Sequence, residues 1–143
     1  MDAYYQEHSG CTYAAMVEQA VIENTGRSPP ILGTCDRGEV HYGPKLGTRE
    51  CNLGFMFNNY HNAVFNARNP QRKRLPGLTH GITVALRDNM CRAEFICYAP
   101  DHKPIGEPIA AEWALRDGNG TPDATAAGAA METLIEKSLA LCV

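Results

Sequence analysis

The alternation of apolar and polar residues is clearest between residues 82 and 98, where it predicts a hairpin of two strands. Apolar residues alternate with smaller or more polar ones over residues 82–87, and the turn pair Asp88-Asn89 follows. One face of the second strand carries Cys91, Ala93, Phe95 and Cys97. This face is expected to lie in the core, so both sulfur atoms would be buried.

Period-two alternation predicts strands at three further places, which are residues 39–42, 51–57 and 109–115. The apolar residues of the second are Cys51, Leu53, Phe55 and Phe57, and those of the third are Ile109, Ala111, Trp113 and Leu115. Because short turns join neighbouring strands, an antiparallel sheet of about four to five strands is expected.

Two segments show the three- and four-residue spacing of an amphipathic helix. The first is residues 13–22, with Thr12 as a candidate cap and Gly26 as a candidate stop. The second opens at Thr121-Pro122-Asp123 and has the apolar stripe Met131, Leu134, Ile135, Leu139 and Cys142. The expected fold is a single α+β domain over residues 1–143, with an N-terminal and a C-terminal helix packed on the sheet.

The six cysteines of the chain are Cys11, Cys35, Cys51, Cys91, Cys97 and Cys142. A strand separates Cys91 from Cys97 by ~20 Å, whereas a disulfide requires Cα atoms within ~7 Å, so these two cannot bond to each other. Because the cysteines lie in different elements, the sequence predicts a disulfide-stabilised domain with long-range bridges worth ~2–4 kcal/mol each. The alternative is that they are free and pack as small hydrophobes.

Composition and charge limit the classes of partner. The chain has 13 Lys and Arg against 16 Asp and Glu, a net charge of −3, so no overall positive field favours nucleic acid. No apolar run approaches the ~20 residues of a membrane span, and residues 1–8 lack the pattern of a signal peptide. We expect a mature secreted chain with an added Met1, or alternatively a cytosolic protein.

Motifs for metals and cofactors do not occur in the sequence. Zinc sites commonly use CxxC or HxxxH pairs, and the nearest pair is His8 with Cys11, so neither a metal nor another cofactor is expected. Cys35 and His41 have the residue types of a thiol–imidazole pair, although a loop cysteine is more often half of a disulfide. Asn119 opens the sequon Asn119-Gly120-Thr121 for N-glycosylation.

The segment Arg72-Lys73-Arg74 is a basic loop between Pro70 and Pro76. Three interpretations are open: a solvated loop without function, a contact for phosphate, and a protease site at Lys73-Arg74. Aromatic residues are not interleaved with the basic ones, so base stacking, and with it nucleic-acid binding, is not expected.

A catalytic alternative rests on His41, Arg87, His102 and a glutamate, either Glu50 or Glu94. These side chains supply a base, an acid and a cation for phosphate. In residue types and in the order of helix and sheet, residues 40–102 are similar to the small secreted guanyl ribonucleases, which implies cleavage of RNA. The histidine motif and glutamate spacing of that family are not reproduced, and such residues are also typical of the polar surface of a sheet.

The whole chain resembles the small cysteine-containing effectors that plant-pathogenic fungi secrete. The resemblance is carried by the scattered cysteines, the sequon at Asn119, the dibasic pair Lys73-Arg74 and the compact α+β pattern. It implies a non-enzymatic virulence protein that binds a host protein. The expected contact surface comprises Tyr60, Arg72, Lys73, Arg74, Arg92, Glu94 and Tyr98.

Overall fold

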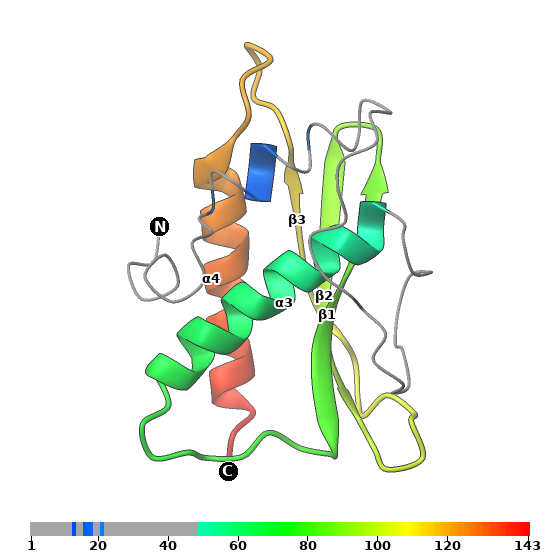
Figure 1. The fold of residues 1–143 in the computed structure, drawn as a ribbon, viewed down its shortest axis with the longest axis vertical. Helices are drawn as coiled ribbons and strands as arrows, with labels where there is room; N and C mark the ends of the chain where they lie inside the picture. Colours follow the sequence, from blue (N-terminus) through cyan, green and yellow to red (C-terminus); the bar gives the residue numbers. More distant parts are fainter. Residues whose placement is uncertain (1–12, 14–15, 19–20, 22–48) are drawn as a thin grey trace.

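The computed structural model describes residue 13, residues 16–18, residue 21 and residues 49–143, with only the backbone of residues 49, 51 and 52. Within these residues the chain forms α3 (Arg49–Ala67), β1 (Thr79–Arg87), β2 (Met90–Tyr98), β3 (Ile109–Ala114) and α4 (Ala124–Ala140) (Figure 1). The expected strand at residues 39–42 lies outside the described residues. The described part of the chain is an α+β fold, as the sequence predicted.

The three strands form one antiparallel sheet in the order β1-β2-β3. Arg87 pairs with Met90 across the Asp88-Asn89 turn, and Thr79 pairs with Tyr98 at the far end of the hairpin. The residues of β2 that were expected in the core are buried, namely Cys91, Ala93, Phe95 and Cys97. The hairpin and its buried face are thus confirmed, whereas the sheet has three strands in the described part of the chain, fewer than expected.

The segment 51–57 is helical, so the prediction of a strand there is wrong. It belongs to α3, which continues to Ala67. The helix residues with no exposed side-chain surface include Leu53, Phe57, Tyr60 and Val64, spaced by four, three and four positions. A short window with an apolar residue at every second position fits either structure, and the longer helical spacing decides it.

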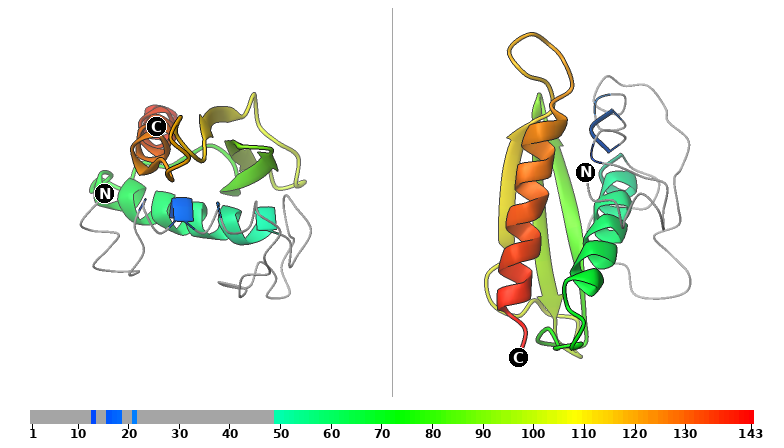
Figure 2. Two further views of the ribbon diagram at one scale, coloured as in Figure 1. Left: turned by 90° about the horizontal axis from the view of Figure 1, so that it is seen from above. Right: turned by 90° about the vertical axis from the view of Figure 1, so that its left-hand side faces the viewer.

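Both helices cover the same face of the sheet (Figure 2). α3 packs mainly on β1 and α4 mainly on β3, so the core lies between the helices and the buried strand faces. Four described residues of the expected N-terminal helix are helical and buried in this core: Tyr13, Met16, Val17 and Val21. Arg92 and Glu112, on the opposite face of the sheet, are exposed.

α4 begins at Ala124, two residues later than the sequence pattern suggested. Its N-cap is Asp123, whose Oδ1 accepts a hydrogen bond from the Ala126 N–H at 2.9 Å. Pro122 forms a β-bridge with Arg116 and is therefore extended rather than helical. The stripe residues Met131, Leu134 and Ile135 have no exposed surface, which places this face of the helix in the core.

The cysteines whose side chains are described are free, namely Cys91, Cys97 and Cys142. Cys91 pairs across the sheet with Leu86 on one side and Trp113 on the other, so its thiol packs as a small apolar group. Disulfide bonding of these three cysteines is therefore not confirmed. Cys11, Cys35 and the side chain of Cys51 lie outside the described residues.

Candidate anion-binding site

The structure does not bring the expected catalytic residues together. Arg87 lies at the hairpin end of β1, and His102 lies in the loop after β2, beyond the opposite end of the hairpin. Eight positions of strand separate Arg87 from Thr79 at that opposite end, a distance of ~26 Å. Glu94 lies midway along β2, and His41 lies outside the described residues. Arg87, Glu94 and His102 therefore do not form one site.

Two residues of the expected contact surface are buried, and their assignment to that surface is wrong. Tyr60 has no exposed surface because α3 turns it toward the core, where its ring packs on Tyr13 at 4.5 Å between centroids. Tyr98 is 7% exposed because the chain after β2 folds back and bridges Tyr98 to Pro104. The alternation of residues within a strand does not predict which of its side chains a loop will cover.

Arg92 and Glu94 are at the surface, as expected, but they are already paired. Arg92 Nε lies 2.9 Å from Glu94 Oε1, and Arg92 Nη1 lies 2.7 Å from Glu112 Oε1 on β3. These hydrogen bonds, the one to Glu112 first, raise the pKa of Arg92. Its charge is neutralised within the protein, so it offers little attraction to an external anion.

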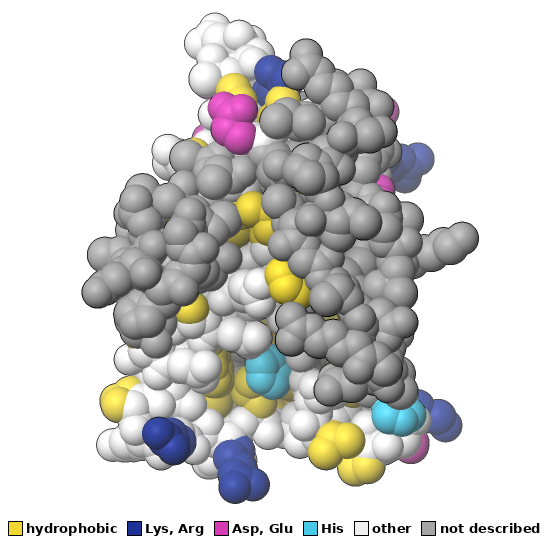
Figure 3. All heavy atoms as spheres, in the orientation of Figure 1, with side chains coloured by type: hydrophobic (Ala, Val, Ile, Leu, Met, Phe, Trp, Pro, Cys, Tyr) yellow, Lys and Arg dark blue, Asp and Glu magenta, His cyan; other side chains and the backbone are white. Residues whose placement is uncertain are grey.

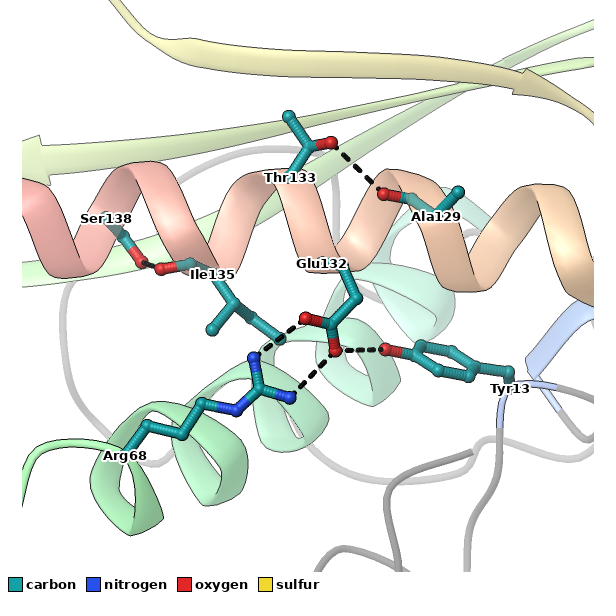
Figure 4. A network of polar contacts seen from close by, with 7 residues as sticks. All are labelled: Tyr13, Arg68, Ala129, Glu132, Thr133, Ile135 and Ser138. Atoms are coloured by element: carbon teal, nitrogen blue, oxygen red, sulfur yellow. Dashed lines mark hydrogen bonds and ion pairs between the residues drawn. The ribbon is translucent and has the colours of Figure 1, made fainter.

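Arg68, just after α3, is paired in the same way (Figure 4). Its Nη1 and Nη2 donate to the two carboxylate oxygens of Glu132 at 2.7 and 2.9 Å, and the Tyr13 hydroxyl donates to Glu132 at 3.4 Å. The arginine holds the pKa of Glu132 below its usual range. This ion pair connects the end of α3 to the middle of α4.

The basic loop Arg72-Lys73-Arg74 differs, because it lines a pocket. The pocket has a volume of about 760 Å³, and the described residues that line it lie between Phe65 and His80, which lead from α3 into β1. All three basic side chains line it and are exposed. Figure 3 shows Lys and Arg side chains at the lower edge of the molecule, where α3 and α4 end. We call this feature the basic pocket.

Hydrogen bonds from Asn69 hold the backbone of the basic pocket. Its Oδ1 accepts from the Lys73 N–H at 3.1 Å, and its Nδ2 donates to the Lys73 carbonyl at 2.8 Å. The Arg72 N–H donates to the Asn69 carbonyl at 3.0 Å. Arg74 and Val143 exchange two backbone hydrogen bonds of 3.3 and 3.1 Å. The three cationic side chains therefore extend from a backbone that is already fixed.

The pocket segment is also anchored to β2. The Leu78 N–H donates to the Tyr98 carbonyl at 2.8 Å. Gly77 has a φ of +90°, and a Cβ built there would lie 2.4 Å from the same Tyr98 oxygen. Only glycine fits this position, because it accepts a positive φ and allows the two backbones to approach closely.

Among the described residues, the lining of the basic pocket contains Arg72, Lys73 and Arg74 but no Asp or Glu side chain. Across the described residues, ion pairs neutralise Arg68 and Arg92, and none involves these three cations. Positive charge concentrated in a concave surface attracts anions, and guanidinium and ammonium groups donate charge-assisted hydrogen bonds to them. The arrangement can therefore bind an anionic group.

Exposed apolar side chains lie at the same end of the molecule as the cations. Leu78 lines the basic pocket and is 66% exposed. Four of the five large hydrophobic residues exposed in the described part of the chain are Leu78, Ile105, Leu141 and Val143. They lie at this end of the molecule, since Val143 bonds to Arg74 and Ile105 packs beside Gly77. Such grouping is typical of a surface that contacts another molecule.

Two neutral histidines lie on the inner side of the basic pocket. His80 lines it, and its ring lies 6.3 Å from the fully buried ring of His61. His61 Nε2 forms a hydrogen bond of 2.8 Å with Ser138 Oγ, whose hydroxyl is also within 2.9 Å of the Ile135 carbonyl oxygen. Burial, with a smaller contribution from His80, lowers the pKa of His61 to about 4, and burial also lowers the pKa of His80. The positive charge of the pocket therefore comes from Arg72, Lys73 and Arg74.

Sequence reasoning identified the basic residues of the pocket but not Asn69, Gly77 or Leu78. The pairs Asn69-Pro70 and Pro76-Gly77, which flank the basic loop, are typical turn formers. They indicate that the loop is structured, although they do not reveal that its cations share one pocket.

Other expectations concern glycosylation, metals and membranes. Asn119 lies in an exposed turn, where Asp117 Oδ1 accepts from the N–H groups of Asn119 and Thr121 at 2.8 and 3.0 Å, and glycosylation there stays a prediction. In the part of the chain that the structure describes, no three His, Cys, Asp or Glu side chains are grouped to hold a metal. No described helix combines the length and apolar character that crossing a membrane requires.

Comparison with known proteins returns no relative: no protein-family model matches the chain, and neither a curated protein nor a solved structure matches it. A function has to be inferred from the site itself.

Proposed function

We propose that this protein is a non-enzymatic binding protein, and that its partner is another protein that places an anionic group in the basic pocket. One observation carries the proposal: Arg72, Lys73 and Arg74 line a single pocket to which the described residues contribute no Asp or Glu side chain, on a backbone that Asn69 holds. Leu78 supports it, because an exposed aliphatic side chain beside the cations supplies apolar contact area.

A protein partner fits the basic pocket better than nucleic acid does. Binding of single strands relies on exposed aromatic rings that stack on bases. Phe65, the phenyl ring in the lining, is only 5% exposed, whereas Leu78 in the same lining is 66% exposed. The net charge of −3 also gives no general attraction to a polyanion.

The ribonuclease hypothesis gains no support from Arg87, Glu94 and His102, which lie apart along the hairpin. Secretion, virulence and a host protein as partner stay predictions. Secretion was expected because the cysteines were expected to be bridged. Cys91, Cys97 and Cys142 are free in the structure, so these three do not support that argument.

Intact mass tests the cysteine part of this interpretation. Alkylation in denaturant without a reductant should add at least three alkyl groups, since three thiols are free in the structure. Alkylation after reduction is the control that gives the total of six. A chain that takes up no alkyl group until it is reduced would contradict the structure and revive the secreted, disulfide-bonded interpretation.

Binding to the basic pocket can be tested with a hexaglutamate peptide as a probe, followed by backbone amide NMR. Shifts are expected for residues between Phe65 and His80, and they should weaken as salt screens the charges. The test variant is Arg72→Gln/Lys73→Gln/Arg74→Gln, named the triple-Gln variant, which should lose the response.

The matched control is Arg87→Gln/Lys103→Gln/Lys137→Gln, which removes the same charge from exposed residues that do not line the pocket. This control should keep most of the response of the wild type. Equal loss in both variants would mean that the peptide senses net charge only, and no response in the wild type would overturn the proposed function.

A further inference from the structure

Arg72 adopts a backbone conformation that costs energy. Its φ is +53°, in the left-handed region that glycine and asparagine adopt more readily than residues with long side chains. The Arg72 N–H bonds to the Asn69 carbonyl, which fixes the turn without any need for the side chain. An arginine at such a position, in the lining of the basic pocket, indicates a use for its side chain.

The number of cations indicates how much charge the ligand carries. A single carboxylate has one negative charge and two oxygens, which one arginine can satisfy, as Glu132 and Arg68 show within this protein. The basic pocket offers three cations on consecutive residues. A phosphate monoester carries about −1.5 to −2 charges and three acceptor oxygens, so it matches this set more fully than a carboxylate does.

The backbone N–H groups of the three basic residues are already used, which affects how an anion would be held. The N–H groups of Arg72, Lys73, Arg74 and Leu78 donate to Asn69, Val143 and Tyr98. Phosphate in this pocket would therefore be bound mainly by the cationic side chains, and the planar guanidinium is well suited to paired hydrogen bonds with phosphate oxygens. Exposed Leu78 would contact an apolar residue next to the phosphorylated one.

We infer that the basic pocket recognises a phosphorylated side chain of the partner protein. This inference rests on the proposed function and narrows its ligand from any anionic group to a phosphate monoester. Asn69 acts as a positioning residue: it does not supply charge, and its amide fixes the loop at Lys73 so that the cations are arranged before the ligand arrives.

The test uses three immobilised peptide libraries with randomised flanks and a fixed central residue: phosphoserine, glutamate or serine. The full chain should be retained on the phosphoserine library about tenfold more than on the glutamate library, and least on serine. The triple-Gln variant should lose this preference, whereas Arg87→Gln/Lys103→Gln/Lys137→Gln should keep it. Asn69→Ala should weaken retention several-fold with all charges intact.

Each outcome decides between the two proposals. Equal retention on phosphoserine and glutamate, lost in the triple-Gln variant, would overturn the phosphate inference and leave the proposed function in place. Retention no better than on serine, or unaffected in the triple-Gln variant, would overturn both. Sedimentation with phosphatidylserine vesicles, lost in the triple-Gln variant and without any preference among the libraries, would also overturn both in favour of a lipid surface.

Discussion

Arginines in two regions of this molecule differ in the acidic side chains that lie next to them. In the packed body, which we define as α3, α4 and the sheet with the residues bonded directly to them, Arg68 is paired with Glu132 and Arg92 is paired with Glu94 and Glu112. In the basic pocket, Arg72 and Arg74 flank Lys73, and no Asp or Glu side chain of the described residues lines the cavity. In the body these two arginines are neutralised, whereas the basic pocket groups three cations for which no ion pair is found among the described residues.

This difference indicates which charges stabilise the fold and which serve binding. An arginine that satisfies a carboxylate connects two elements, as Arg68 connects the end of α3 to α4. A cation without such a partner adds no comparable contact, so its removal should change binding and not stability. The following predictions test the two regions, from the largest expected effect to the smallest.

Acid should destabilise the body through His61. Burial, and to a smaller extent His80, lower the pKa of His61 from 6.5 to about 4. Because folding lowers this pKa, the contribution to stability is complete above pH ~6.5 and is lost as the pH falls toward 4, by about 3 kcal/mol. Urea unfolding between pH 7.5 and 4 measures the loss.

NMR of the imidazole signals provides the control for His61. Its ring should stay neutral at pH 5, because burial lowers the pKa of His61 to about 4. A His61 signal that titrates near pH 6.5 would contradict the buried, neutral imidazole.

Gly77→Ala should break the attachment of the pocket segment to the body. The added Cβ meets the Tyr98 carbonyl oxygen at 2.4 Å, and the φ of +90° is unfavourable for alanine. We expect a loss of about 2 kcal/mol in the free energy of unfolding, together with loss of anion binding.

Two other glycines show how much of this effect comes from the positive φ and how much from the contact with the Tyr98 carbonyl. Gly106 has a φ of +68° but open space around it, and Gly118 has neither a positive φ nor a close neighbour. Gly106→Ala should therefore cost about 1 kcal/mol and Gly118→Ala close to nothing, with binding intact in both. Equal effects at Gly77 and Gly106 would show that backbone conformation alone matters, without the contact to Tyr98.

The pair Arg68–Glu132 should contribute modestly to stability. Both side chains are 38% exposed, so solvent screens the interaction, and a double-mutant cycle with Arg68→Gln and Glu132→Gln should give about 0.5 kcal/mol. The coupling should shrink in high salt. Arg72→Gln is the matched control and should leave the free energy of unfolding unchanged. A greater loss of stability for Arg72→Gln than for Arg68→Gln would contradict the view that the paired arginine stabilises the fold and Arg72 serves binding.

The sequence predicted the hairpin because its buried face alternates regularly from Cys91 to Cys97. It did not predict α3, because residues 51–57 fit both periods and the helical spacing emerges only when Tyr60 and Val64 are included. Short windows cannot separate the two structures, and the contacts that select one are distant in the chain.

The site was predictable only in part for a similar reason. The basic loop is visible in the sequence, but the distinction between paired and unpaired arginines is not. Glu132 is 64 positions from Arg68, and Glu112 is 20 positions from Arg92, so the fold decides which arginines are neutralised. The cysteine pattern could not decide between free and bridged thiols, because a core position suits a free thiol such as Cys91 as well as a bridged one.

The smallest effect is expected at Arg92, a paired arginine that substitutions of its partners can convert into an unpaired one. Arg92→Gln should leave the unfolding midpoint and anion binding unchanged, since its charge is exposed and already neutralised. Glu94→Gln/Glu112→Gln should instead release Arg92 and produce weak phosphate-induced amide shifts on β2 and β3. One released arginine should bind phosphate far more weakly than the basic pocket, because it supplies one cation where the pocket supplies three. If released Arg92 bound phosphate as strongly as the basic pocket, the absence of carboxylates alone would explain anion binding, and the arrangement that Asn69 holds would add nothing.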